Sequence, residues 1–179
     1  VVEGARLGGG AVERQVYDGP WRDIEEDVEA ALYEMADSEL LSVREHEIGE
    51  FLVGQEVGET WNTMLLSVAG TPAELAARAV RDLAADCQRT LPAILSGERE
   101  KSLHFYVGNL GGMRKSIFPS LERRYLDWLQ SGRLEGLEEL VEEGREHWLF
   151  LTRKMCELYS EEPARAGSNI MQLVDTSHL

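Results

Sequence analysis

Cysteine, proline and basic residues are scarce in this 179-residue sequence, which also has no long uninterrupted apolar stretch. No run approaches the roughly 18 uncharged apolar residues of a membrane-spanning helix, so we expect no membrane span. The start of the sequence lacks the basic flank and apolar block of a secretory signal, which favours a cytoplasmic protein. Both cysteines, Cys87 and Cys156, lie in helical patterns beside apolar neighbours. This placement predicts buried free thiols rather than a disulfide.

The shortage of basic residues gives the protein a strong negative charge. The sequence has 18 Lys and Arg against 33 Asp and Glu, for a formal net charge of −15. Such a charge repels a phosphate backbone and argues against general nucleic-acid binding. A basic protein is the more compatible partner, although acidity also serves solubility alone. If such a partner exists, association should slow as salt rises, and the acids expected on the solvent side of the first helix would contribute: Asp23, Glu25, Glu26, Asp27 and Glu29.

Apolar residues recur at helical spacing along most of the chain, whereas alternating strand patterns are almost absent. Short turns separate the periodic segments, and Thr71, Pro72 and Glu74 form a capping pattern at the start of one of them. The sequence therefore predicts an all-α, single-domain bundle of about five helices around a central helix. The expected helices cover about 20–35, 41–68, 72–96, 119–131 and 133–160, with a kink or break at Pro92.

The predicted bundle occupies residues 20–163. The glycine-rich segment 1–19 has no helical period and is expected to be a flexible leader. Residues 164–179 are expected to form a polar tail, because Pro163 ends the last long helix. The apolar part of that tail, 170–174, is expected to dock on the bundle or on a partner.

The segment 41–68 is the expected centre of the bundle because it carries two apolar stripes. A helix that is apolar on two sides needs neighbours on both, so we expect this helix to be the most buried one. Its three interior glycines each cost about 1 kcal/mol of helix propensity relative to alanine, which indicates a close helix approach or a kink. The first stripe comprises Ile48, Phe51, Leu52 and Leu66, the second comprises Val53, Val57, Trp61, Met64 and Val68, and the glycines are Gly49, Gly54 and Gly58.

An irregular glycine-rich stretch, 108–116, precedes the helix that begins at Pro119. Backbone amides of successive glycines and the start of a helix favour a bound anion. The spacing departs from that of a nucleotide-binding P-loop. The alternative is a plain loop whose basic residues pair with neighbouring acids. The predicted binding site for a small anion or a carboxylate consists of Gly111, Gly112, Arg114, Lys115 and Ser116.

Two His/Glu pairs at i, i+4 spacing form a second candidate site. His46 with Glu50 and Glu143 with His147 each project to one side of a helix, as a metal or haem-type site in a bundle requires. The Glu-x-x-His spacing of ferritin-like di-metal sites is absent. The alternative for His147 is a hydrogen-bonded core histidine. For His104, the alternatives are a place in a cofactor pocket and aromatic packing.

Other chemistries have less support. The segment 47–54 faintly resembles the first helix and turn of a helix-turn-helix, but the following segment, 55–63, contains no Lys or Arg to contact phosphates. No serine lies in a G-x-S-x-G turn. The favoured hypothesis is a non-catalytic helical module that binds a partner protein or a small anionic ligand. The alternative is a helical enzyme or cofactor carrier that uses the His/Glu pairs, and the identity of any cofactor stays open.

Overall fold

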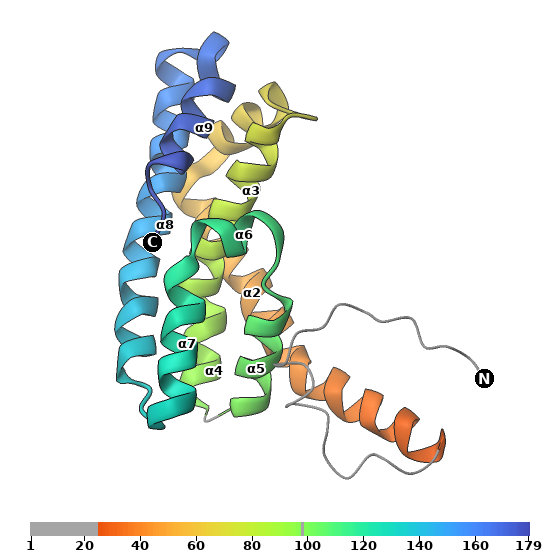
Figure 1. Cartoon of the computed structure of the whole chain (residues 1–179). Helices are drawn as coiled ribbons and strands as arrows, with labels where there is room; N and C mark the ends of the chain where they lie inside the picture. Colours follow the sequence, from red (N-terminus) through yellow and green to blue (C-terminus); the bar gives the residue numbers. More distant parts are fainter. Residues whose placement is uncertain (1–24, 98) are drawn as a thin grey trace, which may run out of the picture.

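The computed structural model describes residues 25–97 and 99–179. All regular structure in these ranges is helical, without strands, which confirms the predicted all-α, single-domain bundle (Figure 1). The predicted leader, 1–19, and the start of the first predicted helix lie outside the described residues. The elements are α2 (Glu25–Ser67), α3 (Pro72–Ala85), the π-helix η1 (Asp86–Thr90), α4 (Leu91–Ser96), α5 (Glu100–Asn109), α6 (Gly112–Ile117), α7 (Pro119–Ser131), α8 (Glu135–Glu161), the 3-10 helix η2 (Pro163–Arg165) and α9 (Ala166–Asp175).

A column formed by α3, η1 and α4 runs through the middle of the bundle (Figure 1). Helix α8 lies along one side of this column, and α7 and α9 pack beside it. Helix α2 lies along another side, and its N-terminal part extends beyond the bundle. Within the described chain, no helix combines the length and apolar character that crossing a bilayer requires.

The central element of the bundle is α3. Eight of its 14 residues are buried, and six of these are alanines, whose short side chains let neighbouring helices approach closely. The prediction that the segment 41–68 is the most buried helix is therefore wrong. Its second stripe does face the core, because Val53, Trp61, Met64 and Val68 are all buried. The first stripe faces outward instead, with Ile48, Phe51 and Leu66 being 37%, 64% and 78% exposed.

Helix α2 is one element where the sequence predicts two helices, 20–35 and 41–68. Two of its glycines allow it to pack closely against the bundle and to bend. A Cβ atom at Gly49 would lie 2.6 Å from the backbone oxygen of Ala85, so α2 and the end of α3 touch there. Gly58 has φ 60° and ψ −156°, which places a kink within α2. These two positions confirm the predicted close approach and kink. No atom of the described chain lies within 4 Å of the position that a Cβ would occupy at Gly54.

The column contains one π-helical turn, η1, just before Pro92. The backbone N–H of Leu91 donates to the carbonyl of Asp86, five residues earlier. Pro92 has no N–H, and in a regular α-helix its ring would collide with the carbonyl four residues earlier. The wider turn removes this conflict, so the helix continues into α4. The predicted kink or break at Pro92 thus takes the form of a π turn.

The end of the chain packs on the bundle. Helix α9 lies against α3 and α8, where Ile170 and Val174 are buried. The predicted docking segment, 170–174, therefore contacts the bundle itself. The backbone N–H of Leu179 donates to the carbonyl of Ile117 at 3.0 Å, beside the junction of α6 and α7. The two cysteines are free and buried, as expected.

Candidate functional site

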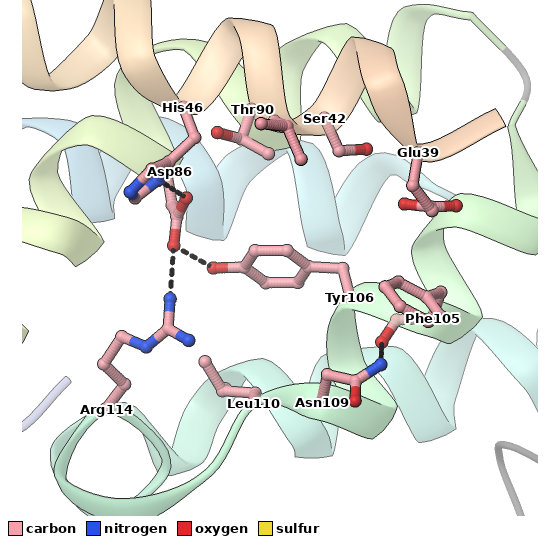
Figure 2. Close-up of a pocket in the computed structure, with 11 residues that line it drawn as sticks. Glu39, Ser42, His46, Asp86, Thr90, Phe105, Tyr106, Asn109, Leu110 and Arg114 are labelled. Atoms are coloured by element: carbon pink, nitrogen blue, oxygen red, sulfur yellow. Dashed lines mark hydrogen bonds and ion pairs between the residues drawn. The ribbon is translucent and has the colours of Figure 1, made fainter. Parts of the chain in front are cut away.

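A cavity of about 300 Å³ lies among α2, η1, α5 and α6 (Figure 2). Helix α2 supplies one wall, because residues at i, i+3, i+4 and i+7 share a helical face. The π turn supplies its first and last residues, Asp86 and Thr90, to the part of the wall beside α2 (Figure 2). The lining residues are Glu39, Ser42, Val43, His46, Asp86, Thr90, Phe105, Tyr106, Asn109, Leu110 and Arg114.

Asp86 is the centre of a polar network at one end of the cavity. Its side chain is buried, and its Oδ1 lies 2.7 Å from Nδ1 of His46. Its Oδ2 accepts a hydrogen bond from the Tyr106 hydroxyl at 2.7 Å and another from Arg114 Nη1 at 3.3 Å (Figure 2). A buried carboxylate needs this degree of compensation, because an unpaired one is strongly destabilising. Three elements, α2, α5 and α6, thus meet on the π turn.

The same contacts shift the protonation of two neighbours of Asp86. Burial, followed by the charge of Asp86, raises the pKa of the Tyr106 hydroxyl well above its usual value, so this group stays a neutral donor. The hydrogen bond to Asp86 raises the pKa of His46, while burial opposes that change. The protonated form of the His46 ring is therefore favoured in this network.

Two hydroxyl groups in the cavity wall have no hydrogen-bond partner in the part of the chain that the structure describes. Ser42 Oγ and Thr90 Oγ1 are buried atoms, and neither forms a hydrogen bond to any described residue. The Thr90 side chain is among the most buried polar ones, since the residue is 2% exposed. A buried polar group without a partner costs roughly 1–3 kcal/mol. Two of the five buried side-chain polar atoms without a partner in the described residues thus belong to the wall of this cavity.

Glu39 marks the other end of the cavity, away from Asp86 and Arg114 (Figure 2). This residue is 9% exposed, and its carboxylate accepts one hydrogen bond, from Ser38 Oγ at 3.3 Å. No cationic side chain of the described chain lies within 4.0 Å of it. Apolar groups line the space between the two ends, among them Val43 and Leu110. The cavity is thus polar at both ends and apolar between them.

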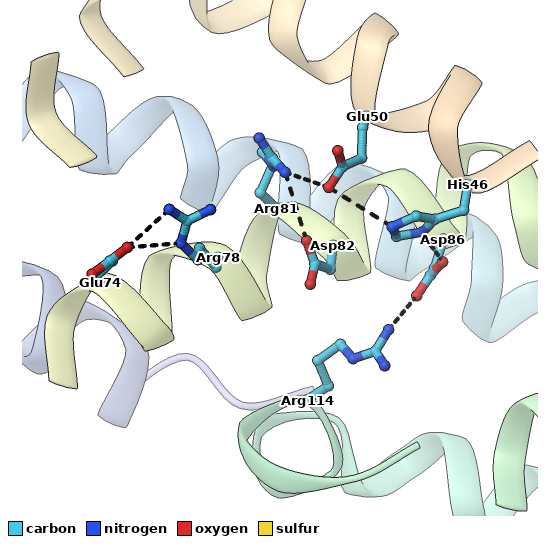
Figure 3. Close-up of polar contacts among 8 residues, drawn as sticks. All are labelled: His46, Glu50, Glu74, Arg78, Arg81, Asp82, Asp86 and Arg114. Carbon is cyan, nitrogen blue, oxygen red and sulfur yellow. Dashed lines mark hydrogen bonds and ion pairs between the residues drawn. The ribbon is translucent and has the colours of Figure 1, made fainter. Parts of the chain in front are cut away.

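A second polar cluster lies beside the cavity, between α2 and α3 (Figure 3). Possible metal-binding atoms of His46, Glu50 and Asp82 all lie within 4.8 Å of one another. His46 Nε2 is 3.7 Å from Glu50 Oε1, on the ring edge opposite to its contact with Asp86. The guanidinium of Arg81 pairs with Glu50 and lies 4.0 Å from Asp82. Burial raises the pKa of Asp82, and the charge of His46 opposes that shift most strongly.

The residues of the predicted anion site separate in the structure. Arg114 lines the cavity, whereas Lys115 points to an exposed ion pair with Glu122. The remaining three, Gly111, Gly112 and Ser116, are exposed and do not line the cavity. The amides of Gly111 and Gly112 therefore do not belong to the wall of this cavity. Arg114 is the residue of the predicted anion site that lines it.

The residues of the predicted metal site also separate. His46 and Glu50 belong to one cluster, but Glu143 is exposed on α8 and does not join it. His147 Nε2 lies 2.7 Å from the backbone oxygen of Ser177, which matches the alternative of a hydrogen-bonded histidine. His104 packs in an aromatic group instead of the cavity, with its Nδ1 2.6 Å from the Tyr125 hydroxyl and its ring beside Trp128.

Comparison with known proteins adds a family but no activity. No curated protein and no solved structure matches the chain. A family model described as "Family of unknown function (DUF6866) C-terminal domain" matches residues 14–177, which is most of the sequence. The helical bundle with its π turn and its cavity is therefore a member of the DUF6866 C-terminal domain family.

Proposed function

We propose that this domain is a non-catalytic helical module that binds a small organic anion in the cavity among α2, η1, α5 and α6. The observation that carries this proposal is the pair of unpartnered buried hydroxyls, Ser42 and Thr90, in the same cavity as Arg114. A ligand that accepts hydrogen bonds would satisfy both groups. Without such a ligand, these hydroxyls only destabilise the fold.

The donors at the Asp86 end favour an anionic group. A guanidinium has five N–H donors, and Arg114 uses one of them for Asp86 within the described residues. The others are available to a carboxylate, which forms strong charge-assisted hydrogen bonds with guanidinium groups. The hydrogen bond to Asp86 raises the pKa of His46, which favours positive charge on this ring at the same end. The ligand's anionic group therefore belongs near Arg114.

The Glu39 end restricts the rest of the ligand. A second anionic group there would meet a buried carboxylate, which like-charge repulsion disfavours. A neutral or cationic group is compatible, and a cation would compensate Glu39. The volume of about 300 Å³ suits a small molecule. We therefore expect a monoanion or a zwitterion with an apolar middle.

The arrangement favours binding over catalysis. An activated serine or threonine needs a base within hydrogen-bonding distance, and neither Ser42 nor Thr90 has one in the described structure. Burial also raises the pKa of the Cys87 thiol well above its usual value, which disfavours the reactive thiolate. The groups of this region are thus suited to holding a ligand.

A series of acids with equal chain length tests the proposal. The probes are hexanoate, 6-aminohexanoate and adipate, and isothermal titration calorimetry measures their affinities at constant ionic strength. We expect 6-aminohexanoate and hexanoate to bind and adipate to bind more weakly. The substitution Glu39→Gln should reduce this discrimination. If none of the three acids binds at millimolar concentration, the proposed ligand class is wrong.

The substitution Thr90→Val separates binding from packing. It should weaken binding of the same probes about tenfold, which corresponds to about 1.4 kcal/mol, a typical hydrogen-bond contribution. It should also raise the melting temperature without ligand, because it removes an unpartnered buried hydroxyl. Thr152→Val is the matched control, since that buried hydroxyl donates to the Trp148 carbonyl at 2.8 Å and lies outside the cavity. Unchanged affinity in the Thr90 variant would place the ligand elsewhere.

A further inference from the structure

We infer that His46, Glu50 and Asp82 form a binding site for a divalent transition-metal ion between α2 and α3. The three side chains bring one imidazole nitrogen and two carboxylates to within 4.8 Å of one another (Figure 3). His46 and Glu50 are four residues apart on α2 and share its face, while Asp82 comes from α3. Two packed helices thus supply a mixed nitrogen and oxygen ligand set.

The orientation of His46 supports this site. Its Nδ1 lies 2.7 Å from Asp86 Oδ1, so in the neutral ring the proton sits on Nδ1 and the lone pair on Nε2. That lone pair is on the side of Glu50, whose Oε1 is 3.7 Å away. A carboxylate that holds the other nitrogen of a ligand histidine is a recurrent feature of metal sites. Asp86 is itself fixed by Tyr106, so the imidazole starts in the required orientation.

The ligand types define the class of ion. Imidazole suits zinc, iron, copper and nickel, whereas calcium and magnesium prefer all-oxygen sites. Three protein ligands leave coordination positions for water or another small molecule. Both thiols are buried, and neither belongs to the cluster, so they do not compete for a soft metal ion there.

In the metal-free protein, Arg81 supplies the positive charge that a bound metal ion would bring to Glu50 and Asp82. Its guanidinium pairs with Glu50 and lies 4.0 Å from Asp82, so one cation already partly balances two carboxylates. A divalent ion would take over this role, and Arg81 would have to leave Glu50. The guanidinium also lies over the ring of Trp61, 5.8 Å from its centroid, which offers it a second interaction. Removal of Arg81 should therefore strengthen metal binding.

The site is distinct from the proposed anion-binding cavity, because Glu50 and Asp82 do not line that cavity. His46 is shared, but binding of the organic acid depends on Arg114 and Thr90. Titration with a metal salt alone therefore tests this inference, whatever the result of the acid titrations. Metal binding releases protons from its ligands, so the titration is made at about pH 8.

The experiment uses the full chain after treatment with a chelator and titration with zinc chloride. Calorimetry should detect one zinc ion per chain, and cobalt chloride should give visible absorption bands. His46→Ala and Asp82→Asn should abolish both signals. Asp86→Asn should weaken binding about 10- to 100-fold, the usual effect of losing the carboxylate behind a ligand histidine. Arg81→Met should strengthen binding. His147→Ala is the control, because His147 lies outside the cluster.

Two results would overturn the inference. One is zinc binding of equal affinity in the wild type and in His46→Ala, since His46 supplies the nitrogen ligand. The other is absence of stoichiometric binding in both the wild type and Arg81→Met, provided that circular dichroism shows a folded variant. Should Arg81→Met fail to fold, Arg81→Gln, which also removes the positive charge, replaces it in the same comparison.

Discussion

Glu45 is the carboxylate of α2 that ties this helix to the π turn. It accepts hydrogen bonds from Arg89 Nε and from Arg44 Nη2, both at 2.9 Å, and it is 5% exposed. The bond from Arg89 contributes most to lowering the pKa of Glu45, followed by the bond from Arg44. The contribution of Glu45 to the free energy of unfolding therefore depends on pH.

The expected effect follows from the direction of that shift. The folded-state pKa of Glu45 lies below its ordinary value of 4.5, so its contribution to stability is complete above pH 4.5 and is lost as the pH falls through the folded pKa. Glu45→Gln should therefore lower the urea midpoint at pH 7, and the gap to the wild type should narrow below pH 4.5. Glu142→Gln, in an exposed pair with Arg145, is the control and should change little. A gap that is constant with pH would contradict this account.

The site illustrates which residues a sequence can reveal. Arg114 and His46 were identified because basic residues and i, i+4 pairs are visible in the order of the chain. Their common partner, Asp86, was missed because it is 28 residues from Arg114 and 40 residues from His46, and only the fold brings them together. The available signal was Pro92, which indicates an irregular turn just where Asp86 and Thr90 lie.

The crossing of α2 and α3 at Gly49 gives a prediction at the element scale. Gly49→Ala would place a methyl group 2.6 Å from the Ala85 backbone oxygen, and backbone atoms cannot easily move. Such overpacking costs about 1–3 kcal/mol, which exceeds the gain of about 1 kcal/mol in helix propensity. Gly49→Ala should therefore destabilise the protein in chemical denaturation.

Gly54 provides the matched control on the same helix. A Cβ there meets no atom of the described residues within 4 Å, and the φ of Gly54 is not in the left-handed region. Gly54→Ala should therefore stabilise the protein by about 1 kcal/mol. If both alanine variants are more stable than the wild type, α2 and α3 do not approach as closely as the structure indicates.

The apolar spacing predicts the long helices, but it does not predict the short helices α5, α6 and α9, the last of which lies in the segment expected to be a polar tail. It also does not predict how deeply each helix lies in the bundle. The apolar spacing of 41–68 correctly predicts a helix. Spacing alone does not show which of the apolar side chains have neighbouring helices to pack against. The spacing therefore predicts that Phe51 and Leu66 are buried, although both are exposed in the structure. The alanines of α3 have little hydrophobic surface each, and their value is that they let several helices pack close to one column.

At the scale of the whole molecule, the net charge of −15 gives a prediction about salt. Like charges repel one another more strongly in a compact chain, and salt screens this repulsion. The screening length falls from about 30 Å at 0.01 M salt to about 10 Å at 0.1 M. The melting temperature should therefore rise by several degrees between these concentrations of sodium chloride and then level off. A fall would mean that the ion pairs outweigh the net repulsion.

The π turn also bears on how many residues this bundle needs. A π turn has about one residue more than the α turn that it replaces, so η1 acts as a single-residue insertion within the column. This extra residue gives the Pro92 ring the room that a regular α turn would not. The same turn supplies Asp86 and Thr90 to the wall of the cavity. A deletion that restores a regular α turn here would therefore disturb both the helix at Pro92 and the cavity wall.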